Sequence, residues 1–452
     1  MSDSYLERTS IEIIMAKTVL KASKVTNFKK DYFWIFGKTI KDIEYFESDP
    51  MRKGFLDNYG FLMSMAGIYL TFPGNWIISM LHLGVGSLQL ICYFYTIYLT
   101  NDMGNVIELL HSAVIVMTIT GPAIINGLLQ RKRLERIMRA LGTGVYDYGV
   151  TLDDDSLKEI REFSIQTRAR KNLFCRIFLA IVVANLFAIG LIKPIAMNLL
   201  TTIEYDDDFD GINKRVPVHC WYPLDSRVPL NNLLCFIFQY VIVVTIPLGV
   251  CGLDLIYLCM AEEIVIQLKI VGTSVKNIKK RAMKVMKLNG TNDINKAMSR
   301  CLGHSIDHHN ALSSLFEDFR NYHFYILLSV MTGATLMLCL AGVIFTTDSV
   351  APVFRLTYVV FINTELVHVL VFCWYGEQIK EMSIKIGDDM YDADWFSESG
   401  HIKIHMLMII QKIVRPFKVT AGGFMDASMD TYANVLSSAY SYFNLVKAAR
   451  EN

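Results

Sequence analysis

The sequence predicts an all-α membrane protein with seven membrane-crossing helices. Of its 452 residues, 53% are hydrophobic and only 19% are charged, and the mean hydropathy is +0.34. Apolar windows of about twenty residues, long enough to cross a bilayer, recur along the chain. Lys and Arg number 44 against 43 Asp and Glu, so no overall field favours a polyanion. We therefore expect contact with membrane lipid and no nucleic-acid partner.

Each apolar window marks one expected crossing, and the last is interrupted at Pro416 and at Thr420 to Phe424. The expected spans are 76–99, 105–128, 172–200, 229–260, 322–346, 353–376 and 403–448. These spans divide the chain into five expected regions. They are a cytoplasmic amino-terminal region with a membrane-entry helix (1–75), helices 1 to 4 with a long extracellular loop at 201–228 (76–261), a cytoplasmic anchor region (262–321), helices 5 and 6 with a cytoplasmic linker (322–402) and a broken, pore-lining seventh helix (403–452).

Basic residues set the expected orientation, because short cytoplasmic loops carry an excess of Lys and Arg. They gather at 17–41 before the first crossing, at 131–139 after the second and at 276–287 after the fourth, while the loop after the third carries an acidic run at 204–210. This predicts a cytoplasmic amino terminus and an extracellular carboxyl terminus, the reverse of a G-protein-coupled receptor. The sequon that begins at Asn289 would then face the cytosol and stay unglycosylated.

The fourth and fifth helices are expected to extend beyond the bilayer. Apolar residues continue at helical spacing after the fourth crossing and before the fifth, which indicates helices that project into the cytosol and pack together. They are Ile264, Leu268, Val271, Val275, Leu312, Leu315, Phe316 and Phe319. For 276–300, with its break at Gly290, we favour a lysine-rich surface loop.

The final apolar run carries a narrow polar stripe. Asn434, Ser438, Ser441 and Leu445 share one helical face with Ala448 or Ala449. A helix in lipid hides such a stripe against a neighbouring helix or around water. Helix packing through small residues is the commoner arrangement, and a pore lining is the alternative.

Ionisable residues within the apolar windows invite a functional interpretation. Asp254, Lys193, Glu365 and His368 are the candidates, and we favour structural pairing over ion conduction. The nine cysteines are scattered without disulfide or metal spacing. The histidines at 304, 308 and 309 are interpreted as a polar helix face, so we expect no metal and no cofactor.

Several motifs resemble those of insect odorant receptors. The most specific lie in the carboxyl quarter, where Pro416, the segment Thr420-Ala421-Gly422-Gly423-Phe424 and the later Tyr440-Ser441-Tyr442-Phe443 resemble the family's terminal motif. Further matching features are Tyr432, Leu436, Ser438, Cys373-Trp374-Tyr375-Gly376-Glu377, Trp395, His309, Leu312, Leu315, Pro217 and Trp221-Tyr222-Pro223.

The resemblance implies an odorant-gated cation channel of four subunits in the membrane of a sensory neuron dendrite. The shorter loop between helices 4 and 5 and the Thr-Ala-Gly-Gly motif differ from the shared co-receptor, so the chain looks like a tuning subunit that joins the co-receptor in a heterotetramer. In that assembly Asn434, Ser438 and Ser441 would line the wide part of a central pore. Leu445 and Ala449 match the two gate positions, although Ala449 is smaller than the usual aliphatic residue.

A volatile odorant needs an apolar, aromatic-lined cavity with few polar groups. The crossing directions place a set of such residues in the outer halves of helices 2, 3, 4 and 6. The expected ligand-binding residues are His111, Val114, Phe187, Leu191, Phe236, Tyr240, Tyr358, Phe361 and Ile362. For any one of them, ordinary core packing is an alternative.

Three other classes remain as alternatives. A seven-helix receptor that acts through G proteins, or a gustatory-type chemoreceptor, would share the helix number, but the lysine distribution and the lack of the Asp-Arg-Tyr and Asn-Pro-x-x-Tyr motifs argue against G-protein coupling. A secondary transporter predicts an internal repeat, and we find one broken helix and no repeat. An enzyme is not expected, because no arrangement of Ser, His and Asp is present.

Overall fold

The computed structural model describes residues 75–120, 129–192, 195, 211–290, 292–346, 352–393, 400–413 and 415–451. Expectations for 1–74, for the acidic run at 204–210, for Lys193 and for Trp395 lie outside these residues. So do the predicted ends of the second crossing (121–128) and of the third (196–200).

Helices make up nearly all of the described chain, which confirms the predicted all-α class. The helices before residue 211 are α4 (Asn75–Leu99), α5 (Met103–Val114), η3 (Ile115–Thr120), α7 (Arg131–Thr143), η4 (Gly149–Thr151), α8 (Asp154–Phe187) and η5 (Ala188–Ile192). Those after it are α10 (Pro229–Lys276), α11 (Ile278–Asn289), α12 (Ile294–Phe345), α13 (Pro352–Tyr391), α14 (Gly400–Ile413) and α15 (Met429–Glu451).

Two small antiparallel hairpins complete the described structure. In the first, β1 (Ile212–Asn213) pairs with β2 (Cys220–Trp221), with Ile212 opposite Trp221. In the second, β3 (Thr420–Ala421) pairs with β4 (Met425–Asp426), with Ala421 opposite Met425. The second hairpin separates α14 from α15, so the predicted break in the last helix is a β-hairpin.

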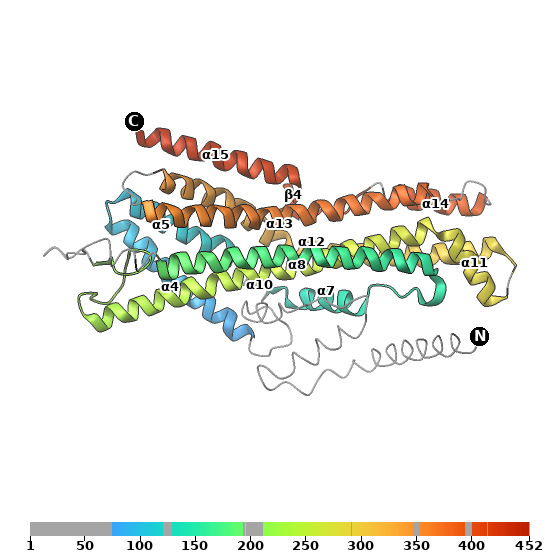
Figure 1. The fold of residues 1–452 in the computed structure, drawn as a ribbon, viewed down its shortest axis with the longest axis horizontal. Helices are drawn as coiled ribbons and strands as arrows, with labels where there is room; N and C mark the ends of the chain where they lie inside the picture. Colours follow the sequence, from blue (N-terminus) through green and yellow to red (C-terminus); the bar gives the residue numbers. More distant parts are fainter. Residues whose placement is uncertain are drawn as a thin grey trace.

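The four long helices α8, α10, α12 and α13 lie side by side along the molecule (Figure 1). Each has a stretch that is long and apolar enough to cross a membrane: Asp154–Leu191, Pro229–Lys276, Ile294–Phe345 and Tyr358–Tyr391. At 1.5 Å per residue, α10 is about 72 Å and α12 about 78 Å long. A hydrocarbon core is about 30 Å thick, so both helices exceed it, as the sequence predicted.

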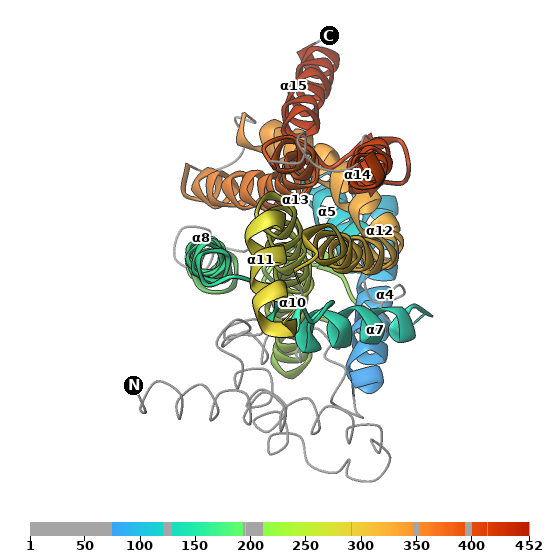
Figure 2. The same cartoon turned by 90° about the vertical axis from the view of Figure 1, so that its right-hand side faces the viewer.

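The centre of the bundle is the second half of α10. Four consecutive residues there, Leu258, Cys259, Met260 and Ala261, have no exposed surface. A helix that is buried on every side must be surrounded by other elements. The view along the molecule shows α10 and α12 inside, α8 and α13 beside them and α15 projecting outward (Figure 2).

We call the part of the bundle around α7 and α11 the basal bundle (131–171, 262–289 and 294–321). Here one expectation was wrong: 276–300 is mostly helical rather than a surface loop, because α11 and the start of α12 occupy it. Ile278, Ala282 and Val285 recur at helical spacing and are buried. Gly290, in the left-handed conformation with φ of 64°, ends α11.

Two buried ion pairs join α8 to α10 at the edge of the basal bundle. Lys171 Nζ lies 2.8 Å from Glu262 Oε2, with side chains that are 0% and 1% exposed, and Arg168 Nη2 lies 3.2 Å from Glu263 Oε2. Removing one partner of such a pair leaves an unpaired buried charge. The two helices are therefore held in one register at this level.

His308 is the centre of a hydrogen-bonded network in the basal bundle. Its Nε2 lies 2.9 Å from Gln267 Oε1 and its Nδ1 lies 3.1 Å from Tyr148 Oη. Because Gln267 Oε1 only accepts, Nε2 carries the proton and Nδ1 accepts from Tyr148. Burial in this network lowers the pKa of His308 to about 3, so the ring stays neutral near pH 7.

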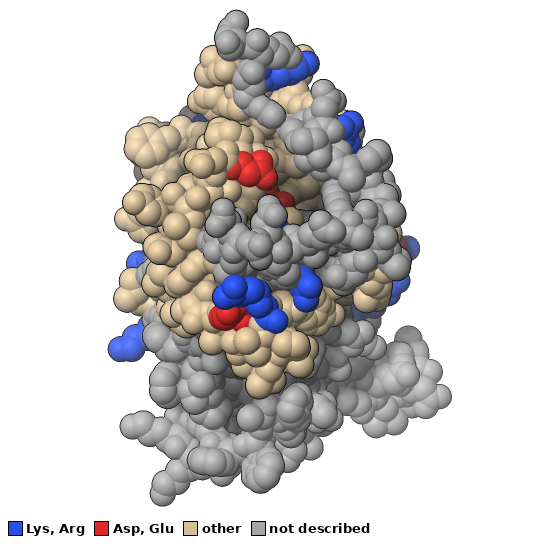
Figure 3. Space-filling model, turned by 90° about the vertical axis from the view of Figure 1, so that its left-hand side faces the viewer, with Lys and Arg blue, Asp and Glu red and all other residues tan. Residues whose placement is uncertain are grey.

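The opposite end of the molecule, which carries the β1–β2 hairpin, has a different character. Its space-filling view shows mostly uncharged surface among the described residues, with one group of basic side chains beside an acidic one and a few separate charged groups (Figure 3). Beneath it, Gln239 Nε2 donates to Val218 O at 2.9 Å and Val218 N donates to Gln239 Oε1 at 2.8 Å. This paired contact fixes the loop before α10 onto the bundle.

Candidate functional site

Two adjoining cavities lie in the half of the bundle that carries the β1–β2 hairpin, among α4, α5, η3, α8, η5, α10 and α13. The first, which we call the α5 chamber, has an empty volume of ≈ 760 Å³ and the second, the α8 chamber, ≈ 590 Å³, and both volumes include space that is open to the surroundings. The two adjoin at a waist of apolar residues that line both. The shared residues are Ile115, Ile189, Val243, Ile246, Pro247 and Phe361.

Irregular backbone accounts for the space at the waist. Pro247 lies inside α10, where its ring removes one backbone hydrogen bond and crowds the preceding turn. Two π-helical turns face it, η3 beginning at Ile115 and η5 containing Ile189. Such turns widen a helix locally and occur often at functional sites. The cavity therefore forms where three helices depart from regular packing.

Aromatic and polar side chains line the α5 chamber. The His111 ring packs edge-on against Phe361, with centroids 4.4 Å apart, and against Tyr358 at 5.9 Å. Tyr358 hydrogen-bonds the side chain of Glu108, and Ser112 adds a hydroxyl to the same wall. The chamber thus combines apolar surface with polar groups that already engage one another.

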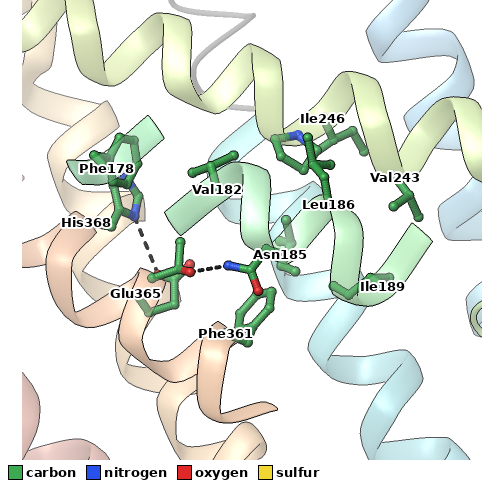
Figure 4. A pocket seen from close by; sticks show the side chains of 13 residues that line it. Phe178, Val182, Asn185, Leu186, Ile189, Val243, Ile246, Phe361, Glu365 and His368 are labelled. Carbon is green, nitrogen blue, oxygen red and sulfur yellow. Dashed lines mark hydrogen bonds and ion pairs between the residues drawn. The ribbon is translucent and has the colours of Figure 1, made fainter. Parts of the chain in front are cut away.

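The α8 chamber ends in a buried polar wall (Figure 4). His368 Nε2 lies 3.1 Å from Asp254 Oδ1, and its Nδ1 lies 3.5 Å from Glu365 Oε2. Asn185 on α8 donates through Nδ2 to the Thr364 hydroxyl on α13. These contacts join α13 to α10 and to α8 at this end of the cavity.

Three of the nine expected ligand-binding residues line the cavity: His111, Tyr358 and Phe361. On α8 and η5 the cavity is lined by Phe178, Val182, Asn185, Leu186 and Ile189, which share one helical face. Phe187 and Leu191 lie on the other face and are 58% and 49% exposed.

The remaining four expected residues lie around the cavity without lining it. Phe236 and Tyr240 stack on each other, with ring centroids 6.1 Å apart, and Tyr240 is 42% exposed next to Gly190. Ile362 packs beside Tyr358 in a separate hydrophobic cluster. Val114 is half-buried on α5.

Several lining residues were not expected from the sequence as ligand contacts. Some carried a signal: Pro247 interrupts an apolar window, and Glu365 and His368 were recognised as ionisable residues within one. Asn185 and Thr364 carried none, because 179 positions separate them and only the fold brings them together.

The five expected pore residues all lie on one side of α15. Asn434, Ser438, Ser441, Leu445 and Ala449 are exposed in the single chain. The other side, with Val435 and Ala439 buried, packs on the bundle, and Figure 2 shows α15 standing at its periphery. A face with three polar side chains and an exposed leucine is therefore left uncovered by the rest of the described chain.

The β3–β4 hairpin and α13 together position the start of α15. Gly422 and Gly423 have φ of 61° and 75°, a conformation that favours glycine. Gly422 N donates to Phe324 O at 3.2 Å, which fixes the turn on α12. Ser428 Oγ accepts from Thr431 N at 3.2 Å as an N-cap of α15.

These features define a helical membrane protein with an internal cavity and a separate polar helix face. The 7tm odorant receptor profile matches residues 105–440. The chain therefore belongs to the odorant receptor family.

Relatives in Drosophila melanogaster show partial similarity. Putative odorant receptor 92a is 27% identical over 140 residues, which cover 31% of this chain and 34% of that protein, and odorant receptor 67c is 26% identical over 147 residues, 32% of this chain and 36% of that protein. The chain thus spans about a third of the length of these curated relatives.

The fold resembles that of the insect olfactory receptor OR5 from Machilis hrabei. In the structure of that receptor in complex with eugenol, the match covers 91% of this chain and 100% of that one, with a TM-score of 0.72 and 13% identity. A second structure of OR5 gives a TM-score of 0.71 with 13% identity, over 91% of this chain and 99% of that one. The odorant receptor fold is therefore present, although the sequences have diverged far.

Proposed function

We propose that this chain is the odorant-sensing subunit of a ligand-gated, nonselective cation channel in the plasma membrane of sensory neurons. It is a tuning subunit that joins the odorant receptor co-receptor in a heterotetramer. Its amino terminus is cytoplasmic and its carboxyl terminus extracellular, so the basal bundle lies in the cytosol. The observation that carries this proposal is the pairing of a largely apolar cavity within the bundle with an exposed polar face on α15.

A small volatile molecule binds in the cavity mainly through burial. Transfer of apolar surface from water contributes roughly 25 cal/mol per Å², so a molecule of about ten heavy atoms reaches about micromolar affinity without a salt bridge. The waist residues Ile115, Ile189, Val243 and Ile246 supply the apolar contacts. Tyr358 and His111 are placed to orient the ligand within the α5 chamber.

A hydrophobic cluster connects the cavity to α15. Tyr358 lines the α5 chamber and also packs with Ile344 of α12 in a cluster that includes Phe443 and Val446 of α15. Gly342 brings α12 close to Phe443, because a Cβ there would lie 3.1 Å from its Cδ2. A ligand that displaces Tyr358 thereby moves the packed side of α15.

The opposite side of α15 forms the conduction path in this proposal. Asn434, Ser438 and Ser441 line the wide part, and Leu445 with Ala449 forms the narrow outer end. A ring of leucine side chains closes a pore by dewetting, because water and ions do not readily enter a narrow apolar neck. Ligand binding opens the pore by rotating or separating the four α15 helices.

The test is patch-clamp recording of cells that express this chain with the co-receptor, the co-receptor alone or this chain alone, against a panel of volatiles. We expect odorant-evoked cation currents only when both are present. An antibody against an amino-terminal tag should stain permeabilised cells alone. An odorant response carried entirely by second messengers, with no added conductance, would contradict the proposal.

A further inference from the structure

The polar wall of the α8 chamber contains a hydrogen-bond acceptor without a partner. Asn185 is 7% exposed, and its Oδ1 is buried with no hydrogen-bond partner. In the close view the amide oxygen of Asn185 points away from Glu365 toward Phe361 and the cavity (Figure 4). A buried polar atom without a partner costs free energy that a bound polar group can recover.

The neighbouring threonine fixes the orientation of this amide. Thr364 Oγ1 donates its single hydrogen to Val360 O at 2.9 Å. Its oxygen can then only accept, so Asn185 must present its NH₂ group to Thr364. The carbonyl oxygen of the amide is left for the cavity, and it cannot exchange places with the nitrogen without losing that hydrogen bond.

The rest of the wall is also rich in acceptors. His368 contacts Asp254 through one ring nitrogen and Glu365 through the other. Both contacts are hydrogen bonds when the three groups share two protons, for example one on each ring nitrogen, and the two carboxyl groups and the ring then carry one net negative charge. Asp254 Oδ2 has no hydrogen-bond partner.

We propose that the α8 chamber is a specificity subsite for odorants with an apolar body and a terminal hydrogen-bond donor, a hydroxyl or amino group. The donor binds Asn185 Oδ1, and the apolar body lies along the waist toward Phe361. Molecules of the same shape that only accept hydrogen bonds, such as ethers and ketones, leave Asn185 unpaired and meet the negative wall. This inference rests on the proposed function, because it names the ligand class of the same cavity.

The experiment compares matched ligands on cells that express this chain with the co-receptor. The probes are 2-phenylethanol, its methyl ether, 2-phenylethylamine and ethylbenzene, together with further alcohol and ether pairs of other lengths. We expect alcohols and amines to act at concentrations about tenfold lower than the matched ethers, since one buried hydrogen bond contributes on the order of 1 kcal/mol or more.

Two variants separate recognition from folding. Asn185→Leu, which keeps the branched shape of the side chain, should raise the half-maximal concentration of the alcohols about tenfold relative to that of ethylbenzene. Thr364→Val should release the amide, so that Asn185 can turn its NH₂ group to the cavity and ethers gain potency. Asn363→Leu is the matched control. Asn363 lies next to Thr364 on α13, its side chain is exposed, and its Nδ2 donates to Val359 O within the same helix.

Several outcomes would overturn the inference. If alcohols and ethers act equally on the native complex while the panel opens the channel, the subsite is wrong but the odorant function stands. A parallel loss of all probes in Asn185→Leu would show a structural role only. If no volatile opens the complex although a co-receptor agonist does, the proposed function fails, and this inference fails with it.

Discussion

Gly376 of α13 fits against the hairpin that begins α15, and this contact yields the sharpest structural prediction. A Cβ at this position would lie 2.1 Å from Ala427 O and 2.7 Å from Ala427 Cβ, where ordinary contact begins at 3.4 Å. In Gly376→Ala the backbone of the hairpin or of α13 must therefore move by about 1 Å, because no flexible side chain can give way.

The displaced region holds the first turn of α15. Glu377 Oε2 accepts from Met429 N at 3.4 Å, so the shift loosens the α15 amino terminus as well. Overpacking of this kind costs about 1–3 kcal/mol, and more where only backbone can move. We expect Gly376→Ala to lower the melting temperature of the complex in detergent and to reduce the odorant-evoked current per surface receptor about tenfold.

The assay is whole-cell recording normalised to surface biotinylation, with Gly303→Ala as the matched control. Gly303 lies within α12, and no atom lies within 4 Å of the position that an added Cβ would take, so alanine there should be neutral or stabilise by up to about 1 kcal/mol. Equal currents from both variants at equal surface expression would refute the idea that the α13 contact positions α15.

Three further predictions follow from other contacts. First, burial lowers the pKa of His308 to about 3, whereas a histidine in the unfolded chain has a pKa of about 6.5. As the pH falls, the unfolded state therefore binds a proton before the folded state does. The free energy of unfolding should drop by about 2 kcal/mol between pH 7 and pH 5. Denaturation at both pH values checks this, and His308→Gln should reduce the loss by about 2 kcal/mol; the same pH dependence in both proteins would contradict it. Second, Lys171→Met should destabilise by about 3–5 kcal/mol by leaving Glu262 unpaired. Lys280→Met, which removes an exposed pair with Asp155 at 3.7 Å, should cost less than about 1 kcal/mol, and equal losses in thermal denaturation would disprove the distinction. Third, Tyr358→Ala should change the rank order of volatile agonists in dose-response curves, whereas Phe187→Ala, on the exposed face of α8, should leave it unchanged; the reverse pattern would place the ligand elsewhere.

The course of the helices could be predicted from the sequence because apolar windows report directly on burial in lipid. Their ends were harder. α8 begins at Asp154, well before the expected start at 172. Its N-cap Asp153 accepts from Ser156 N at 3.1 Å, but this segment is polar, and a search for apolar windows does not detect a helix start there. α11 was missed for the same reason, since lysines on its exposed face obscured the apolar residues at 278, 282 and 285.

The cavity was only partly accessible from the sequence. When a helix is apolar on every side, its hydrophobic pattern does not reveal which face points inward, and the expected Phe187 and the lining Leu186 are neighbours in the chain. Aromatic content identified Tyr358 and Phe361. The hydrogen bond between Asn185 and Thr364 depends on two helices meeting, which no local pattern encodes.

Cysteine accessibility on α15 tests the central claim most directly. All nine native cysteines are buried, so an introduced thiol can be modified selectively. With the co-receptor and an agonist present, a charged thiol reagent applied from outside should block the current through Ser441→Cys and leave Ala439→Cys, on the packed face of the same helix, unaffected. Unchanged current through Ser441→Cys after confirmed modification would contradict the account.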